Sequence, residues 1–149
     1  MHARILTKDD HPTHRGPTLI RPLTAASEAW HDGRIAKLFA PAFVRHDRRR
    51  VIAQPPADAA AYITSIVELE RLTGAFPIYV MQEPVGARGQ RLCAIRLIGH
   101  LGADEMSMIV VIQTDDTVGR LEQLIQYDPE DIDDALAELD RLYAELGEY

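Results

Sequence analysis

The sequence of 149 residues predicts an α+β fold, with most helices preceding a mostly antiparallel sheet. Three observations predict it. In the first half, apolar residues recur every three or four positions in three segments. In the second half, four strand-like segments are separated by short loops that contain Gly or Asp. A final amphipathic segment with helical spacing closes the chain.

The first half is expected to hold three helices around a short strand. Helical spacing covers residues 18–33 and 34–40, and the first of these ends at an Asp-Gly pair. Residues 42–46 have the aromatic and β-branched content of a short strand. A third helix is expected over residues 55–74, with Asp58 as its N-cap and Gly74 as its end.

The second half is expected to form an antiparallel meander. Its strand-like segments are residues 76–85, 91–101, 106–114 and 120–128. The short loops between them favour hairpins. Pro84 cannot donate a ladder hydrogen bond, so it predicts a sheet edge or a bulge.

A helix is expected from residue 128 to the end of the chain. Asp128 is the expected N-cap, Pro129 takes the first helical position, and acidic residues follow where the helix dipole favours them. The acidic run lacks the central glycine of a calcium loop.

Composition restricts the classes of partner. The formal net charge is −7, the opposite of what a general nucleic-acid or anionic-membrane binder carries. The chain has one cysteine, and no stretch approaches 18 apolar residues. We therefore expect a cytoplasmic protein with no nucleic-acid or membrane partner.

Residues 1–17 are polar and contain two prolines, so we expect a flexible arm followed by one domain over 18–149. No apolar signal segment is visible in this arm. His11 and His14 are spaced like a metal clip, but no further ligand follows at the right spacing. We expect neither a metal nor a cofactor.

Two segments carry a resemblance to a known family. They are "AWHDGRIAKLFAPAFVRHD", residues 29–47, and "GRLEQLIQYDPEDIDDALAELDRLY", residues 119–143. Through them residues 18–146 resemble the NTF2-like superfamily, in its SnoaL-like and ketosteroid-isomerase-like branch. The resemblance implies a cone, in which a curved sheet wraps over helices and leaves a deep apolar pocket. The family includes isomerases, dehydratases, cyclases, epoxide hydrolases and non-catalytic binding domains, so the fold does not fix the function.

Asp47 is the leading candidate for a catalytic base. Counted from "LFA", it falls where the resemblance places the general base of ketosteroid isomerases. The alternative is that Asp47 caps the turn into "RRR" and pairs with an arginine, which lowers its pKa. His46 is a second candidate, because imidazole titrates near neutral pH. Neighbours on a strand point to opposite faces, so only one of the two can face the pocket.

Three other residues are candidate proton donors or anion contacts. Arg96 and His100 share one face of their strand, which meets either solvent or the cavity. The hydroxyl of Tyr127 needs a partner if it is buried, and pairing with Asp47 or His46 would complete a site. The strand "MSMIVVIQT" is apolar where ketosteroid isomerases carry an acidic donor, and the first helix has no tyrosine. Steroid isomerisation of that type is therefore not expected.

The predicted pocket wall is apolar. Its candidate ligand-binding residues are Trp30, Phe39, Phe43, Tyr62, Ile98 and Val110. We expect the protein to bind a small, largely apolar molecule and to perform cofactor-free acid-base chemistry on it, such as isomerisation, cyclisation, dehydration or epoxide opening. One alternative is a non-catalytic ligand-binding or dimerisation module. A weaker one is a phosphate or nucleic-acid contact at the arginine run, which consists of Arg45, Arg48, Arg49 and Arg50. "MSMIVVIQT" is apolar on both faces, and a second subunit covering one of them predicts a homodimer.

Overall fold

The fold is α+β, as the sequence predicts. A computed structural model describes residues 27–51, 53–115 and 119–147. In chain order its elements are α2 (Ser27–His31), the 3-10 helix η2 (Arg34–Leu38), β1 (Phe39–Asp47), β2 (Ala57–Asp58), α3 (Ala59–Thr73), β3 (Ile78–Arg88), β4 (Leu92–Leu101), β5 (Asp104–Thr114), β6 (Leu121–Tyr127) and α4 (Ile132–Leu146). The predicted arm, its His11 and His14, and the start of the helix expected from residue 18 lie outside the described residues. None of the described helices is long and apolar enough to cross a bilayer.

The sheet has six strands in the order β2-β1-β6-β5-β4-β3. Strands β3 to β6 form the predicted antiparallel meander. The first strand pairs in parallel with the last, β1 with β6, a pairing that the sequence analysis did not predict. Pro84 lies on the edge strand β3 between two register shifts, which confirms the predicted edge or bulge.

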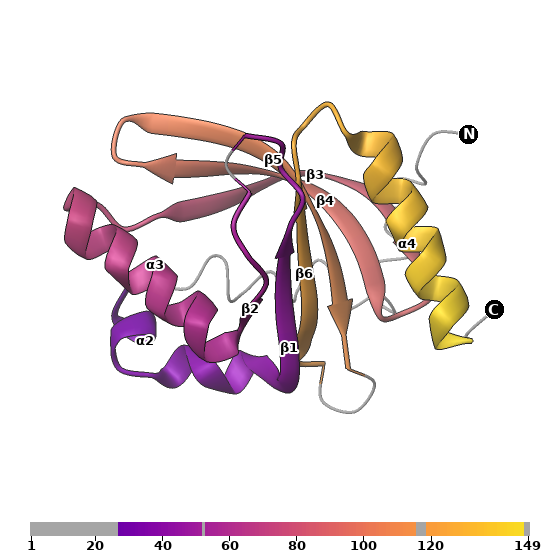
Figure 1. Cartoon of the computed structure of the whole chain (residues 1–149), viewed down its shortest axis with the longest axis horizontal. Coiled ribbons are helices and arrows are strands. Elements are labelled where there is room, and N and C mark those ends of the chain that lie inside the picture. Colours follow the sequence, from indigo (N-terminus) through magenta and orange to yellow (C-terminus); the bar gives the residue numbers. More distant parts are fainter. Residues whose placement is uncertain (1–26, 52, 116–118, 148–149) are drawn as a thin grey trace.

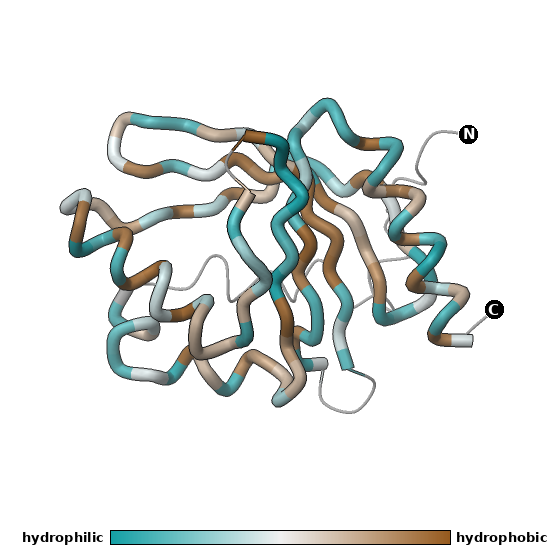
Figure 2. The backbone as a smooth tube through the Cα atoms, in the orientation of Figure 1, coloured by the Kyte–Doolittle hydropathy of each residue, from teal (hydrophilic) through white to brown (hydrophobic). Residues whose placement is uncertain are grey.

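Helices cover both faces of the sheet (Figure 1). Side chains alternate along β5, so Met108 and Val110 join the core beneath α2 and α3, whereas Ile109 and Val111 join the core beneath α4. Figure 2 shows the apolar segments concentrated in the middle of the strands. The second apolar face of β5, which we expected a partner subunit to cover, is covered by α4 of the same chain.

The ends of the two long helices follow local chemistry. Asp58 caps α3 by accepting a hydrogen bond from the amide of Ala61 at 2.8 Å, and Gly74 ends it with φ 78°, a left-handed conformation that favours glycine. The N-cap predicted for α4 is wrong, because the helix begins at Ile132 with Asp131 as its N-cap. The carboxylates of Asp128 and Asp131 bind Arg50 instead of capping the helix.

Candidate functional site

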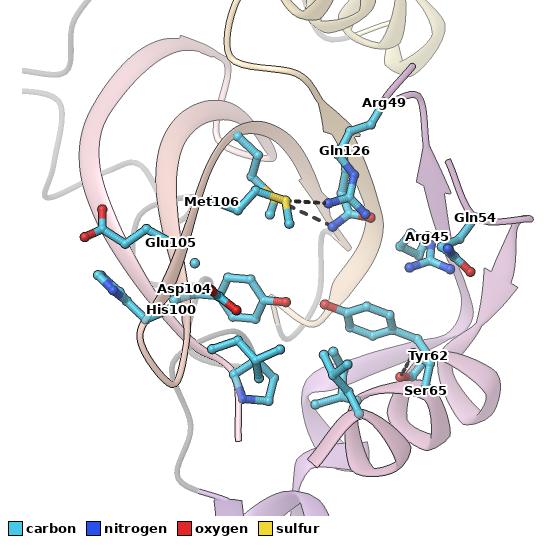
Figure 3. A pocket seen from close by; sticks show the side chains of 17 residues that line it. Arg45, Arg49, Gln54, Tyr62, Ser65, His100, Asp104, Glu105, Met106 and Gln126 are labelled. Atoms are coloured by element: carbon cyan, nitrogen blue, oxygen red, sulfur yellow. Dashed lines mark hydrogen bonds between the residues drawn. The ribbon is translucent and has the colours of Figure 1, made fainter. Parts of the chain in front are cut away.

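A cavity of about 470 Å³ opens between α3 and the face of the sheet that α3 covers (Figure 3). Figure 1 shows the β4–β5 hairpin and the start of β3 extending over α3. Residues of these segments, among them Tyr79, Leu101 and Met106, line the cavity. Its lining residues are Arg45, Arg49, Gln54, Tyr62, Ser65, Ile66, Leu69, Pro77, Tyr79, Gly99, His100, Leu101, Asp104, Glu105, Met106, Met108 and Gln126. The volume is in the range of cavities that bind small molecules.

The register of β1 decides which of its polar residues face the cavity side. Phe43 packs in the core beneath α3, so Arg45 and Asp47 at alternate positions point the same way. His46 points to the α4 side, where Glu138 and Arg141 influence its pKa. The question that the sequence left open is thereby answered: Asp47, not His46, lies on the cavity side of the sheet.

The side chain of Asp47 is nevertheless fully buried, and hydrogen bonds to other residues occupy its carboxylate. Its carboxylate has 0% exposure and accepts hydrogen bonds from Arg49 Nε at 2.8 Å and from Arg49 Nη2 at 2.7 Å. The amides of Arg49 and Gln54 donate to it as well, both at 3.1 Å. Burial disfavours the charged carboxylate, but these hydrogen bonds outweigh it and hold the pKa of Asp47 below its usual value. A carboxylate held in this way is a weak base.

Besides pairing with Asp47, Arg49 forms part of the cavity wall. Its Nη1 lies 3.2 Å from the sulfur of Met106, which connects the end of β1 to β5. Because Asp47 balances its charge, Arg49 contributes shape to the cavity and no net charge.

Arg45 differs from Arg49, because within the described chain no carboxylate pairs with it. It is 7% exposed, and its Nε has no hydrogen-bond partner among the residues that the structure describes. Its Nη2 donates to the carbonyl of Pro55 at 3.2 Å, and its guanidinium lies 5.5 Å from the centre of the Tyr62 ring. Gln126 is 5% exposed, and its side-chain amide oxygen, Oε1, also lacks a partner among the described residues. Two buried polar groups on the cavity wall are therefore unsatisfied.

Two tyrosines complete the interior. Figure 3 shows the Tyr62 ring extending from α3 into the cavity. Burial raises the pKa of Tyr62 well above its usual value and raises that of Tyr79 as well. Both hydroxyls therefore stay protonated at neutral pH and can donate hydrogen bonds.

Solved structures share this architecture. A protein of the SnoaL-like family from Agrobacterium tumefaciens is 11% identical, with a TM-score of 0.54, over 74% of this chain and 91% of that one. An NTF2-like protein of unknown function from Cytophaga hutchinsonii is 10% identical, with a TM-score of 0.51, over 89% and 98% of the two chains. The protein has the NTF2-like fold.

A computationally designed binder of 17-OHP is also similar, at 12% identity and a TM-score of 0.58, over 80% of this chain and 95% of that one. By sequence, no family model and no curated protein matches the chain. Since identities this low establish the fold alone, the function must be argued from the cavity.

Within the NTF2-like cone, three of the five candidate catalytic residues lie on the α4 side of the sheet, away from the cavity. Tyr127 is buried there, and its hydroxyl lies 3.3 Å from Glu138, not beside Asp47 or His46. Arg96 lies near Glu83, at 3.2 Å, and near the carbonyl of Pro129. His46 is the third.

The remaining candidates divide between the cavity and the core. His100 and Tyr62 line the cavity. Trp30, Phe39, Phe43 and Val110 belong to the hydrophobic core beside it, and Ile98 is half-buried outside the lining. Trp30 and Phe39 pack edge to face with Tyr62, and Phe43 packs against it at a tilt, so these rings fix the position of the Tyr62 ring instead of forming the wall.

Arg45, Tyr79 and Gln126 line the cavity although the sequence did not predict them there. Arg45 was grouped with the arginine run, although its alternation with Phe43 on one strand was a usable signal. Gln126 lies opposite Asp47 in the β1–β6 register, which no single sequence reveals. The described residues contain no cluster of three or more His, Cys, Asp or Glu that could hold a metal ion.

Proposed function

We propose that the protein binds a small, largely apolar molecule in this cavity. The observation that carries the proposal is a hollow of about 470 Å³ whose wall combines apolar side chains with a few buried polar groups. Ile66, Leu69, Pro77 and Met108 supply much of the apolar surface. Burial of an apolar ligand against such a wall drives binding, and the polar groups orient it.

The test is a binding assay with a cavity-filling variant and a matched control. Ser65 and Thr64 are neighbouring exposed positions on α3, but only Ser65 lines the cavity. Ligand-observed NMR against 2-naphthamide, decanamide and 2-tetralone is expected to detect binding to the wild type and to Thr64→Phe. Binding is expected to be lost in Ser65→Phe. Equal binding by both variants, or none of the three probes binding to the wild type, would contradict the proposal.

The second candidate function is cofactor-free acid-base chemistry on the bound molecule. One observation favours it, namely that His100, whose imidazole is a general acid-base group, lines the same cavity as two protonated tyrosines. Asp47 is a weaker candidate, because Arg49 occupies its carboxylate.

Exchange of the acidic α-protons of 2-tetralone in D₂O tests this second function. If His100 is the base, the protein speeds exchange and His100→Asn abolishes the effect, whereas Asp47→Asn does not. Loss of exchange in Asp47→Asn alone, while that variant still binds 2-tetralone as tightly as the wild type, would restore Asp47 as the base. Exchange at the background rate by the wild type would leave ligand binding as the function.

A further inference from the structure

Counting only the described residues, the buried part of the cavity carries one uncompensated positive charge. Asp47 balances Arg49, whereas Arg45 has no acidic partner among the residues that the structure describes. The acidic lining residues Asp104 and Glu105 are exposed, and Figure 3 shows them on the side of the cavity opposite Arg45. They do not neutralise Arg45.

An unpaired buried charge is destabilising unless something compensates it. The carbonyl of Pro55 and the ring of Tyr62 each offset part of this cost for Arg45. Neither contact uses Nε, which is buried and has no acceptor within the described part of the chain. The guanidinium edge is therefore complementary to an anion that the cavity would receive.

We propose that the molecule bound in this cavity carries one carboxylate, which pairs with Arg45. The inference rests on the proposed ligand-binding function and names the chemical class of the ligand. A guanidinium presents its N–H groups in a planar fork that matches a carboxylate. The apolar body of the ligand would then lie against Ile66, Leu69 and Met108.

A monoanion fits better than a phosphate. One unpaired arginine neutralises one negative charge, so a phosphate dianion would leave a buried negative charge uncompensated. The hydroxyl of Tyr62 can donate a further hydrogen bond to a carboxylate oxygen, because burial keeps that hydroxyl protonated.

The net negative charge of the whole protein makes a comparison of acidic with neutral ligands informative. With a formal net charge of −7, the chain repels anions in general. Any preference for an acid over its neutral isostere must therefore come from a local positive group. Arg96 provides a matched control, because Arg96→Met makes the same change in charge on the α4 side of the sheet, outside the cavity lining.

The experiment compares two acids with their amides by calorimetry: 2-naphthoate with 2-naphthamide, and decanoate with decanamide. The wild type and Arg96→Met are expected to bind the acids at least about tenfold more tightly, as expected for a hydrogen-bonded charge pair. Arg45→Met is expected to bind acid and amide within about twofold of each other. If Arg45→Met does not fold, Arg45→Lys is used, and its preference for the acid is expected to fall without vanishing.

The outcomes separate the two proposals. If the wild type binds amides as tightly as acids, or if the preference survives in Arg45→Met, the carboxylate assignment is overturned while ligand binding stands. An undiminished preference in Arg45→Lys would overturn it in the same way. If neither acids nor amides bind, the proposed function itself fails.

Discussion

Asp47 and Arg49, two residues apart at the end of β1, form an enclosed ion pair with two parallel hydrogen bonds, Nε to Oδ1 at 2.8 Å and Nη2 to Oδ2 at 2.7 Å. The exposed fractions of the two side chains are 0% and 11%. The pair fixes the turn after β1 and determines which arginine beside the cavity remains unbalanced. The main role of Asp47 is therefore structural, not catalytic.

Replacing Asp47 by Asn is therefore expected to destabilise the protein by about 3 kcal/mol, because Arg49 would keep a buried charge without its partner. Urea denaturation measures the loss. Asp32→Asn is the matched control, because Asp32 also accepts hydrogen bonds from the amide and Nε of an arginine two residues on, but in an exposed pair. A similar loss in both variants would show that burial is not the cause.

The same pair predicts a pH dependence of stability. The pKa of Asp47 is lowered in the folded protein, so its contribution is complete above the unfolded value of about 3.9 and is lost as the pH falls through the folded value. Between pH 5 and pH 2, Asp47→Asn is expected to lose less stability than the wild type. Parallel curves of unfolding free energy against pH would contradict this.

His46 predicts a second dependence, near neutrality. Burial first, and the nearby Arg48 next, lower its pKa in the folded state. Protonation then favours the unfolded chain, so the contribution of His46 is present above about pH 6.5 and declines below it. His46→Gln is expected to reduce the stability lost between pH 7.5 and pH 5.5. The side chain is partly exposed, so the effect is expected to be below about 1 kcal/mol.

Removing the unpaired charge at Arg45 is expected not to weaken the ligand-free protein. Arg45→Met loses the bond to the Pro55 carbonyl and the contact with the Tyr62 ring, but it also removes an uncompensated buried cation. The expected melting temperature is equal to or above that of the wild type. A fall of several degrees would assign Arg45 a structural role.

Gly99 predicts a steric effect on the cavity. A Cβ at this position would lie 3.2 Å from Cε1 of Tyr79, so Gly99→Ala requires the tyrosine ring to move. Both residues line the cavity, and the displaced ring is expected to weaken binding of 2-naphthamide. The double variant Gly99→Ala/Tyr79→Leu removes the clash and serves as the control. Unchanged affinity in Gly99→Ala alone would show that the ring does not shape the bound state.

Local signals explain what the sequence could predict. Asp58 and Gly74 mark the limits of α3 because capping and left-handed backbone are properties of single residues. Short loops predict the hairpins for the same reason. The start of α4 was misplaced because Arg50, 78 residues from Asp128, takes the carboxylate expected to cap it. Long-range pairing of this kind leaves no local pattern.

In the candidate site, too, local patterns predict some features, whereas others depend on long-range pairing. Alternation along β1 separates His46 from Asp47, but it does not show which of them faces α3. That depends on the parallel pairing with β6, which places Asp47 opposite Gln126. The sequence does not show which side of the sheet α4 covers. Tyr127 and Arg96 could therefore be predicted as pocket residues, although both lie on the α4 side.

The parallel pairing of β1 with β6 has a consequence for how the chain reaches its native state. The meander of β3 to β6 uses contacts close in sequence, so it can assemble early. Strand β1 must wait for a partner that begins at Leu121, more than seventy residues after β1 ends at Asp47. Before β6 is in place, the only strand that β1 can pair with, among the described residues, is the two-residue β2, so the wall that carries Arg45 is not yet joined to the meander. Completion of the binding hollow is therefore expected to be a late step in folding.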